Sequence, residues 1–187
     1  VSWDAPVSNG GTALTSYTVV STPSSRSCTV TAPATSCVVT GLTNGTSYTF
    51  KVAAVNSAGT GAYSVASSAV VPKTIPGTPT GVSATRGDTS ATVSWVSPST
   101  GGAVITGYTV TSTPGGYTCT SSVTSCVVTG LTNGTSYQFQ VLATNSEGSG
   151  VISALTTSVT PNVVPLAPTS ATATYGNARA TVSWDAP

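Results

Sequence analysis

The stretch Gly41-Leu-Thr-Asn-Gly-Thr-Ser-Tyr48 decides the fold, because it recurs unchanged as Gly130-Leu-Thr-Asn-Gly-Thr-Ser-Tyr137. Asn-Gly is a strong signal for a tight turn, and in each copy alternating apolar and polar residues follow it. One face is expected to hold Tyr48, Phe50, Val52 and Ala54, or Tyr137, Phe139, Val141 and Ala143 in the second copy. The other face would hold Thr49, Lys51, Ala53 and Val55, or Gln138, Gln140, Leu142 and Thr144. This period of two predicts a strand with one face in a core.

Further anchors recur in the same order at intervals of about 90 residues, the sign of a repeat protein. They are the tryptophan of Val-Ser-Trp (Trp3, Trp95, Trp184), a tyrosine (Tyr17, Tyr108) and two cysteines (Cys28 and Cys37, Cys119 and Cys126). The copies differ in length only between tryptophan and tyrosine and between the two cysteines. Both segments are therefore predicted to be loops, which tolerate insertions. Helical periodicity is absent.

The composition excludes several classes of function. The 187 residues include five Lys and Arg, four Asp and Glu and no histidine, so 5% are charged, against about 25% in ordinary domains. The net charge is only +1, so the chain has no basic patch to neutralise the phosphates of a nucleic acid. We therefore expect no nucleic-acid partner. General acid–base pairs and metal sites lack their residues, so we predict a non-enzyme without cofactor or metal. No apolar run is long enough for membrane insertion.

The first six and the last six residues have the same sequence, Val-Ser-Trp-Asp-Ala-Pro, at Val1 to Pro6 and at Val182 to Pro187. Domain boundaries are better placed at the proline-rich stretches 71–79 and 161–168, because proline favours extended linkers over strands. Two interpretations stay open. The chain is either an arbitrary window on a long tandem array, which we favour, or a unit that a neighbouring chain completes by donating a strand.

These residues resemble the fibronectin type III family along the whole chain. The resemblance rests on the tryptophan of the second strand, the tyrosine of the third, the leucine and tyrosine of the corner (Leu42 and Tyr48, Leu131 and Tyr137) and the leading Pro-x-x-Pro at 76–79 and 165–168. It implies an all-β chain of tandem seven-stranded, immunoglobulin-like β-sandwiches, with sheet A-B-E facing C′-C-F-G. The expected domains are 1–74, a repeat lacking its first strand, 75–162, a complete repeat, and 163–187, the first two strands of a third. The corner sequence is similar to repeats of bacterial secreted and cell-surface proteins.

The family register places the cysteines of each repeat on strands C′ and E, which adjoin across the sandwich. This resemblance implies disulfides Cys28–Cys37 and Cys119–Cys126. A metal site is the rival interpretation, but two thiolates without histidine make an incomplete ligand shell. A redox pair would need Cys-x-x-Cys, which is absent. Persistent disulfides imply an oxidising, extracellular setting.

Arg86-Gly87-Asp88 spells the integrin-recognition tripeptide that one animal fibronectin type III domain carries on its F–G loop. Here it falls between the first two strands, where the third repeat has Tyr175-Gly176-Asn177. We therefore favour a tight turn with positive φ at this place over an adhesion site. Asn44-Gly-Thr and Asn133-Gly-Thr are glycosylation sequons by pattern, but the fold itself calls for an Asn-Gly corner there.

The aromatic residues divide into core and surface candidates. The three tryptophans could serve as a sugar-stacking platform, but their register in the second strand predicts core positions, like those of the tyrosine and leucine anchors. Tyr63 and Tyr117 match no core anchor and are expected to be exposed.

Three functions remain open. The favoured one is a structural repeat segment of a bacterial surface or filament-forming protein, extracellular, with copies of itself as partner, because a nearly uncharged surface favours association. Outward residues such as Val55 and Leu142 are expected to make those contacts. The alternatives are a spacer of a secreted, polysaccharide-active enzyme, and an adhesin or virion decoration domain that binds a surface polysaccharide or host receptor.

Overall fold

A computed structural model describes residues 1–187, and every regular element in it is a strand. This confirms the all-β fold of tandem β-sandwiches. Residues 1–74, 75–162 and 163–187 are called the first, second and third repeat below. The first holds β1 (Leu14–Thr22), β2 (Ser27–Thr31), β3 (Thr49–Asn56) and β4 (Gly59–Thr60). The second holds β5 (Thr80–Arg86), β6 (Ser90–Val96), β7 (Ile105–Thr113), β8 (Thr118–Ser121), β9 (Ser125–Thr129), β10 (Gln138–Asn145) and β11 (Gly148–Ser149); the third holds β12 (Thr169–Gly176) and β13 (Arg179–Asp185).

The second repeat contains both sheets that the family resemblance implies. One has the order β5-β6-β9, which is A-B-E, and the other β11-β10-β7-β8, which is G-F-C-C′. Burial alternates along β6 and β10 as the period of two predicts. The inner faces meet in a core whose largest fully buried side chain is Phe139, beside Val93, Val110, Val128 and Val141.

In the first repeat, only one of the two sheets is complete. Its strand order is β2-β1-β3-β4, and its core gathers Val19, Tyr48 and Phe50. The partner layer is reduced to an isolated bridge between Ser2 and Ser36. The core therefore lies under one full sheet and the short remnant of a second.

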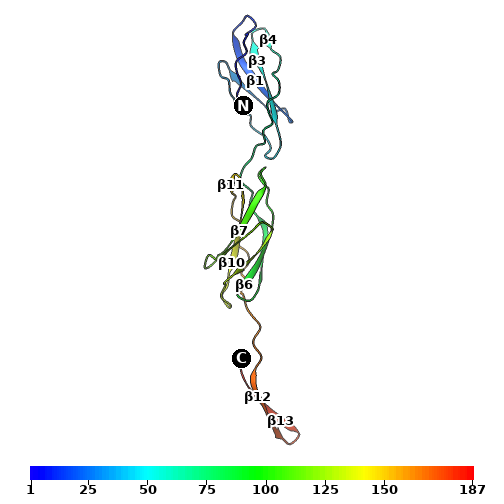
Figure 1. Ribbon diagram of the computed structural model, residues 1–187, viewed down its shortest axis with the longest axis vertical. Coiled ribbons are helices and arrows are strands. Elements are labelled where there is room, and N and C mark those ends of the chain that lie inside the picture. The colour runs from blue at the N-terminus through cyan, green and yellow to red at the C-terminus, as the bar shows by residue number, and fades with distance from the viewer. The chain divides into compact units, whose positions relative to one another are not determined.

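The third repeat is a two-stranded antiparallel hairpin of β12 and β13 (Figure 1), paired from Thr169–Asp185 to Gly176–Arg179. No third strand joins it, and all its residues are exposed. Trp184 is 60% exposed on this hairpin; the third repeat holds only the two strands expected from the sequence for residues 163–187, so a core position for Trp184 stays a prediction.

Two features of the alternating strands differ from expectation. Ala53 was expected on the outer face of β3 but is buried, since a methyl group is small enough to be covered by its neighbours. Val55 and Leu142 are half-buried instead of fully exposed, so each presents only part of its side chain to solvent.

Both segments of variable length are loops. Residues 4–13 and 97–104 between tryptophan and tyrosine hold no strand, and neither do residues 32–35 and 122–124 between the cysteines. The turn after β5 forms where expected, but positive φ falls on Thr89 (44°), and on Ala178 (54°) in the third repeat, instead of on the glycine. Gly87 is needed for space, because a Cβ there would lie 2.5 Å from Ser90 Oγ.

Candidate functional site

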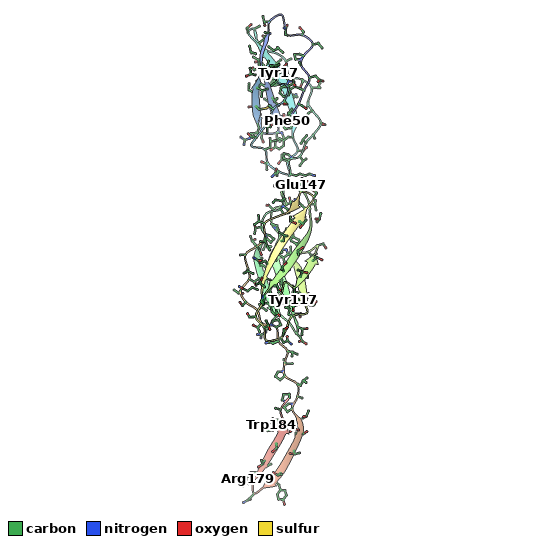
Figure 2. The ribbon with its side chains drawn as sticks, turned by 90° about the vertical axis from the view of Figure 1, so that its left-hand side faces the viewer. Tyr17, Phe50, Tyr117, Glu147, Arg179 and Trp184 are labelled. Atoms are coloured by element: carbon green, nitrogen blue, oxygen red, sulfur yellow. A yellow bond between two sulfur atoms is a disulfide. The ribbon has the colours of Figure 1, made fainter.

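The anchor residues of the first two repeats pack as aromatic pairs. Trp95 lies 5.1 Å from Tyr108 between ring centroids, and Trp3 lies 5.3 Å from Tyr17. Trp95 is buried, whereas Trp3 is half-buried and lines a hollow of about 310 Å³ together with Tyr17. The tryptophans thus stabilise each sandwich through tilted ring contacts. Figure 2 shows Tyr17 and Phe50 within the first repeat.

The corner tyrosines tie the loop before β3 and β10 to the core. Tyr48 Oη accepts a hydrogen bond from the Thr43 N–H at 3.0 Å, and Tyr137 Oη accepts one from the Thr132 N–H at 3.1 Å. Leu131 is buried beneath the second corner, whereas Leu42 is only half-buried. The bond from the Thr43 backbone N–H lowers the pKa of Tyr48, because it stabilises the phenolate.

Each of the first two repeats carries one disulfide, between the two cysteines that the family resemblance pairs. The structure joins Cys28 to Cys37, with Cα atoms 6.5 Å apart, and Cys119 to Cys126, with Cα atoms 6.2 Å apart. No cysteine is free. Cys119 lies on β8 and Cys126 on β9, so this bond links the two sheets of the second sandwich at their edges.

Arg86-Gly87-Asp88 lies in the turn between β5 and β6, and its acidic side chain is engaged. Asp88 Oδ1 accepts a hydrogen bond from Asn133 Nδ2 at 2.8 Å. The Oδ1 of Asn133 accepts one from the Thr89 N–H at 3.0 Å. Asn133 therefore links the Asn-Gly corner to the A–B turn, a structural role that the sequence pattern did not reveal. A sugar on Asn133 would replace one of the two amide hydrogens.

Asn145, at the end of β10, is a second structural residue that sequence reasoning missed. Its Nδ2 donates to the carbonyls of Thr74 and Thr100, at 2.9 and 2.8 Å, and its Oδ1 accepts from the Glu147 N–H at 2.9 Å. The equivalent Asn56 donates to the Asn9 carbonyl and accepts from the Ala58 N–H. The signal available in the sequence was an asparagine at the same offset from the corner in both repeats.

The two tyrosines expected on the surface differ. Tyr63 is 48% exposed. Tyr117 is half-buried, because its ring packs edge-on against Tyr137 with centroids 6.0 Å apart. Only Tyr63 remains a candidate for contact with a partner.

An apolar patch lies on the outer face of the β6–β9 pair. We define the valine patch as Val96, Val123 and Val127, whose side chains are 59, 62 and 52% exposed. Ser94 faces Ser125, and the Trp95 N–H donates to the Thr124 carbonyl, so the same register sets Val96 beside Val123. Val127 lies on the same face, opposite Thr92, and the Ser94–Ser125 pair stands between it and the other two valines.

The rest of the chain offers few residues that could form a binding or catalytic site. A hollow of about 500 Å³ in the first repeat is lined by Asn9, Leu14 and Asn56 among others, with no charged residue. The chain has no group of three or more Cys, Asp and Glu residues placed to hold a metal ion. It also has no helix of the length and apolarity required to cross a membrane.

The model of the fibronectin type III domain matches residues 1–70 and again residues 77–159. The chain belongs to the fibronectin type III family. The two matched ranges contain the Trp–Tyr pairs, the corner tyrosines and both disulfides described above. Proteins of many different functions contain domains of this family, so membership establishes the fold of the chain and does not establish its function.

Three curated relatives of the chain come from animals. The chain is 32% identical over its whole length to fibronectin type III domain-containing protein 1 of Margaritifera margaritifera, of which it covers 26%. It is 35% identical, over 72% of its length, to human protein sidekick-1, of which it covers 7%. Among solved structures, the FN1–FN3 domains of chicken CNTN1 match 95% of this chain and 67% of that one, at 22% identity and a TM-score of 0.49. The chain thus spans about a quarter or less of the curated relatives it matches.

Proposed function

We propose that the chain is a non-catalytic structural segment of an extracellular protein, in which disulfide-bonded fibronectin type III repeats contact copies of themselves. The observation that carries this proposal is a surface with almost no charge and with exposed apolar side chains. Only 5% of residues are charged, while the valine patch alone exposes three valines by more than half. A free monomer would ordinarily carry more charge to resist association.

The disulfides support the extracellular part of the proposal. Disulfides persist in oxidising compartments and are rare in the cytosol. Each disulfide joins two cysteines of the same repeat, at sequence separations of 9 and 7 residues. Each of these two repeats is therefore cross-linked independently of the other. A tandem array gains from this arrangement, because every unit resists unfolding on its own.

The finer expectation of a bacterial surface protein rests on the corner sequence Gly-Leu-Thr-Asn-Gly-Thr-Ser-Tyr alone. The relatives named above come from animals and give it no support. The structural role depends on the surface and on the repeats, and it is independent of the source organism.

Electron microscopy of the native material tests the structural role. We expect ordered assemblies in which copies of the chain contact one another at regular intervals. Dispersed particles without ordered contacts between chains would overturn the proposal.

A further inference from the structure

The segment that follows β11 in the second repeat pairs with β10 at an unusual spacing. Residues 150–159 run beside β10 at the edge of the sheet β11-β10-β7-β8. Every third residue of this segment donates its backbone N–H to β10 or to the residue before it, in the bonds Gly150 to Ala143, Ser153 to Val141, Thr156 to Phe139 and Val159 to Tyr137. The accepting carbonyls follow at every second residue. Three residues of the edge segment therefore oppose two of β10, which is a β-bulge repeated along the segment.

The first repeat pairs in the same way. The bonds there run from Gly61 to Ala54, Ser64 to Val52, Ser67 to Phe50 and Val70 to Tyr48, at 2.8 to 2.9 Å. Residues 61–70 and 150–159 share the pattern Gly-x-x-Ser-x-x-(Ser or Thr)-x-x-Val, while the residues between these positions mostly differ. The spacing of three is therefore tied to the shared positions.

Hydroxyl groups replace the backbone acceptors that a regular ladder would supply. In an antiparallel pair, the N–H groups of Phe139 and Val141 would donate to backbone carbonyls of the edge segment. Here Phe139 donates to Thr156 Oγ1 at 3.1 Å, and Val141 donates to Ser153 Oγ at 2.9 Å. The equivalent bonds of the first repeat, to Ser67 Oγ and Ser64 Oγ, are 3.0 and 3.1 Å long. Ser153 and Thr156 are buried, so an N–H left without an acceptor would be costly there.

Three carbonyls of the edge segment are bound by side chains of the same repeat. Gln140 Nε2 donates to the Ser153 carbonyl at 3.3 Å, and Gln138 Nε2 donates to the Thr156 carbonyl at 2.9 Å. Ser153 Oγ, which accepts from Val141, donates to the Ala154 carbonyl at 2.9 Å. These acceptors are thus already occupied at the edge.

The side chains of this edge are apolar enough to attract another strand. Val151, Ile152 and Leu155 are 59, 45 and 44% exposed, and residues 150–159 include no charged residue and no proline. An exposed apolar edge strand invites pairing with other chains, and lysine, proline and bulges are common protections against it. Of these three protections, the segment has the bulge.

We propose that the period-three pattern closes this edge of the first two repeats against strand addition. An added strand presents its bonding groups at every second residue, whereas the pairing unit of the edge segment is three residues long. The two spacings lose register after one pair, so a continuous ladder cannot form. This inference goes beyond the proposed function and does not rest on contacts between copies, because edge closure is a property of each repeat.

Amide hydrogen exchange tests the part played by the hydroxyls. Ser153→Ala removes the acceptor of the Val141 N–H, so we expect that amide to exchange roughly two- to tenfold faster, while Phe139, bound to Thr156, stays unchanged. Ser153→Thr is the matched control, since Thr156 shows that threonine serves at such a position. Val141 exchange that is equal in the unaltered chain and the alanine variant would overturn the role of the hydroxyl.

A double variant tests the closure itself. Ser153→Val with Thr156→Val removes both hydroxyls, and β-branched valine favours a regular strand. We expect the infrared band of intermolecular β-sheet to grow in this variant beyond that of the unaltered chain, at a temperature where both are folded. Tyr137→Phe weakens the same repeat without altering the edge segment, so it controls for lost stability.

A double variant whose intermolecular β-sheet band equals that of the unaltered chain, or of Tyr137→Phe, would overturn edge closure. Assembly of the unaltered chain, seen by electron microscopy, tests the proposed function separately. Either proposal can therefore fail without the other.

Discussion

The Asn133 side chain donates its Nδ2 hydrogen to Asp88 Oδ1 at a distance of 2.8 Å, and so joins the two motifs of this chain that most resemble recognition signals. Asn133 belongs to a sequon, and Asp88 closes an Arg-Gly-Asp tripeptide. Both side chains belong to the second repeat, and their hydrogen bond stabilises the contact between the Asn-Gly corner and the A–B turn. Both motifs therefore have a structural role in this repeat.

Asn133→Ala should lower the free energy of unfolding by about 1–2 kcal/mol, because two hydrogen bonds are lost and Asp88 and the Thr89 N–H lose their partner. The matched control is Asn44→Ala, since Asn44 holds the same place in the first corner but makes no such bond to a turn. The control should change stability by less than about 0.5 kcal/mol. Urea unfolding measures both, and equal effects would contradict the structural role of Asn133.

Asp88→Ala should leave cell attachment unchanged, because the carboxylate is already held by Asn133. An attachment assay on surfaces coated with each protein compares it with the unaltered chain. The Ser90→Ala variant, in the same turn, controls for changes in coating. Attachment that requires Asp88 and not Ser90 would restore the adhesion interpretation.

Tyr137→Phe should destabilise the second repeat by about 1–2 kcal/mol, since the Thr132 N–H loses its acceptor in a partly buried corner. Tyr63→Phe is the control, because Tyr63 is exposed and its hydroxyl makes no hydrogen bond within the chain. Chemical denaturation followed by tryptophan fluorescence gives both values. A loss of the same size in the two variants would show that the corner bond contributes nothing.

Native protein should contain no reactive thiol. Alkylation without reductant should add no label, and alkylation after reduction should label four cysteines, as mass spectrometry would show. Replacing Cys119 and Cys126 together by serine should cost about 2–3 kcal/mol of stability on the chain-entropy model. Four labels before reduction would remove both the pairing and the case for an extracellular setting.

Much of the fold follows from the sequence, because the anchors that repeat are those that pack. The alternation along β10 depends on the period of two, and Trp95 and Tyr108 are both predicted as core anchors, although their direct contact is not. The two loops of variable length were visible as differences between copies. Family resemblance added the strand order and the disulfide pairing, which composition and spacing alone do not supply.

The remaining features depend on neighbours that no local pattern encodes. Ala53 is buried because of what surrounds β3, and Tyr117 is half-buried because Tyr137 lies beside it. The bonds of Asn133 and Asn145 join segments at least 44 residues apart, except for the short contact with Glu147. Such long-range polar contacts arise only once the sandwich has formed.

Sedimentation velocity of the 187-residue chain over a wide range of concentration tests self-association, the central claim, most directly. We predict that the weight-average sedimentation coefficient rises with concentration and changes little with added salt, because the proposed contacts are apolar and screening by salt acts on charges. A coefficient that stays at the monomer value at every concentration would contradict the account.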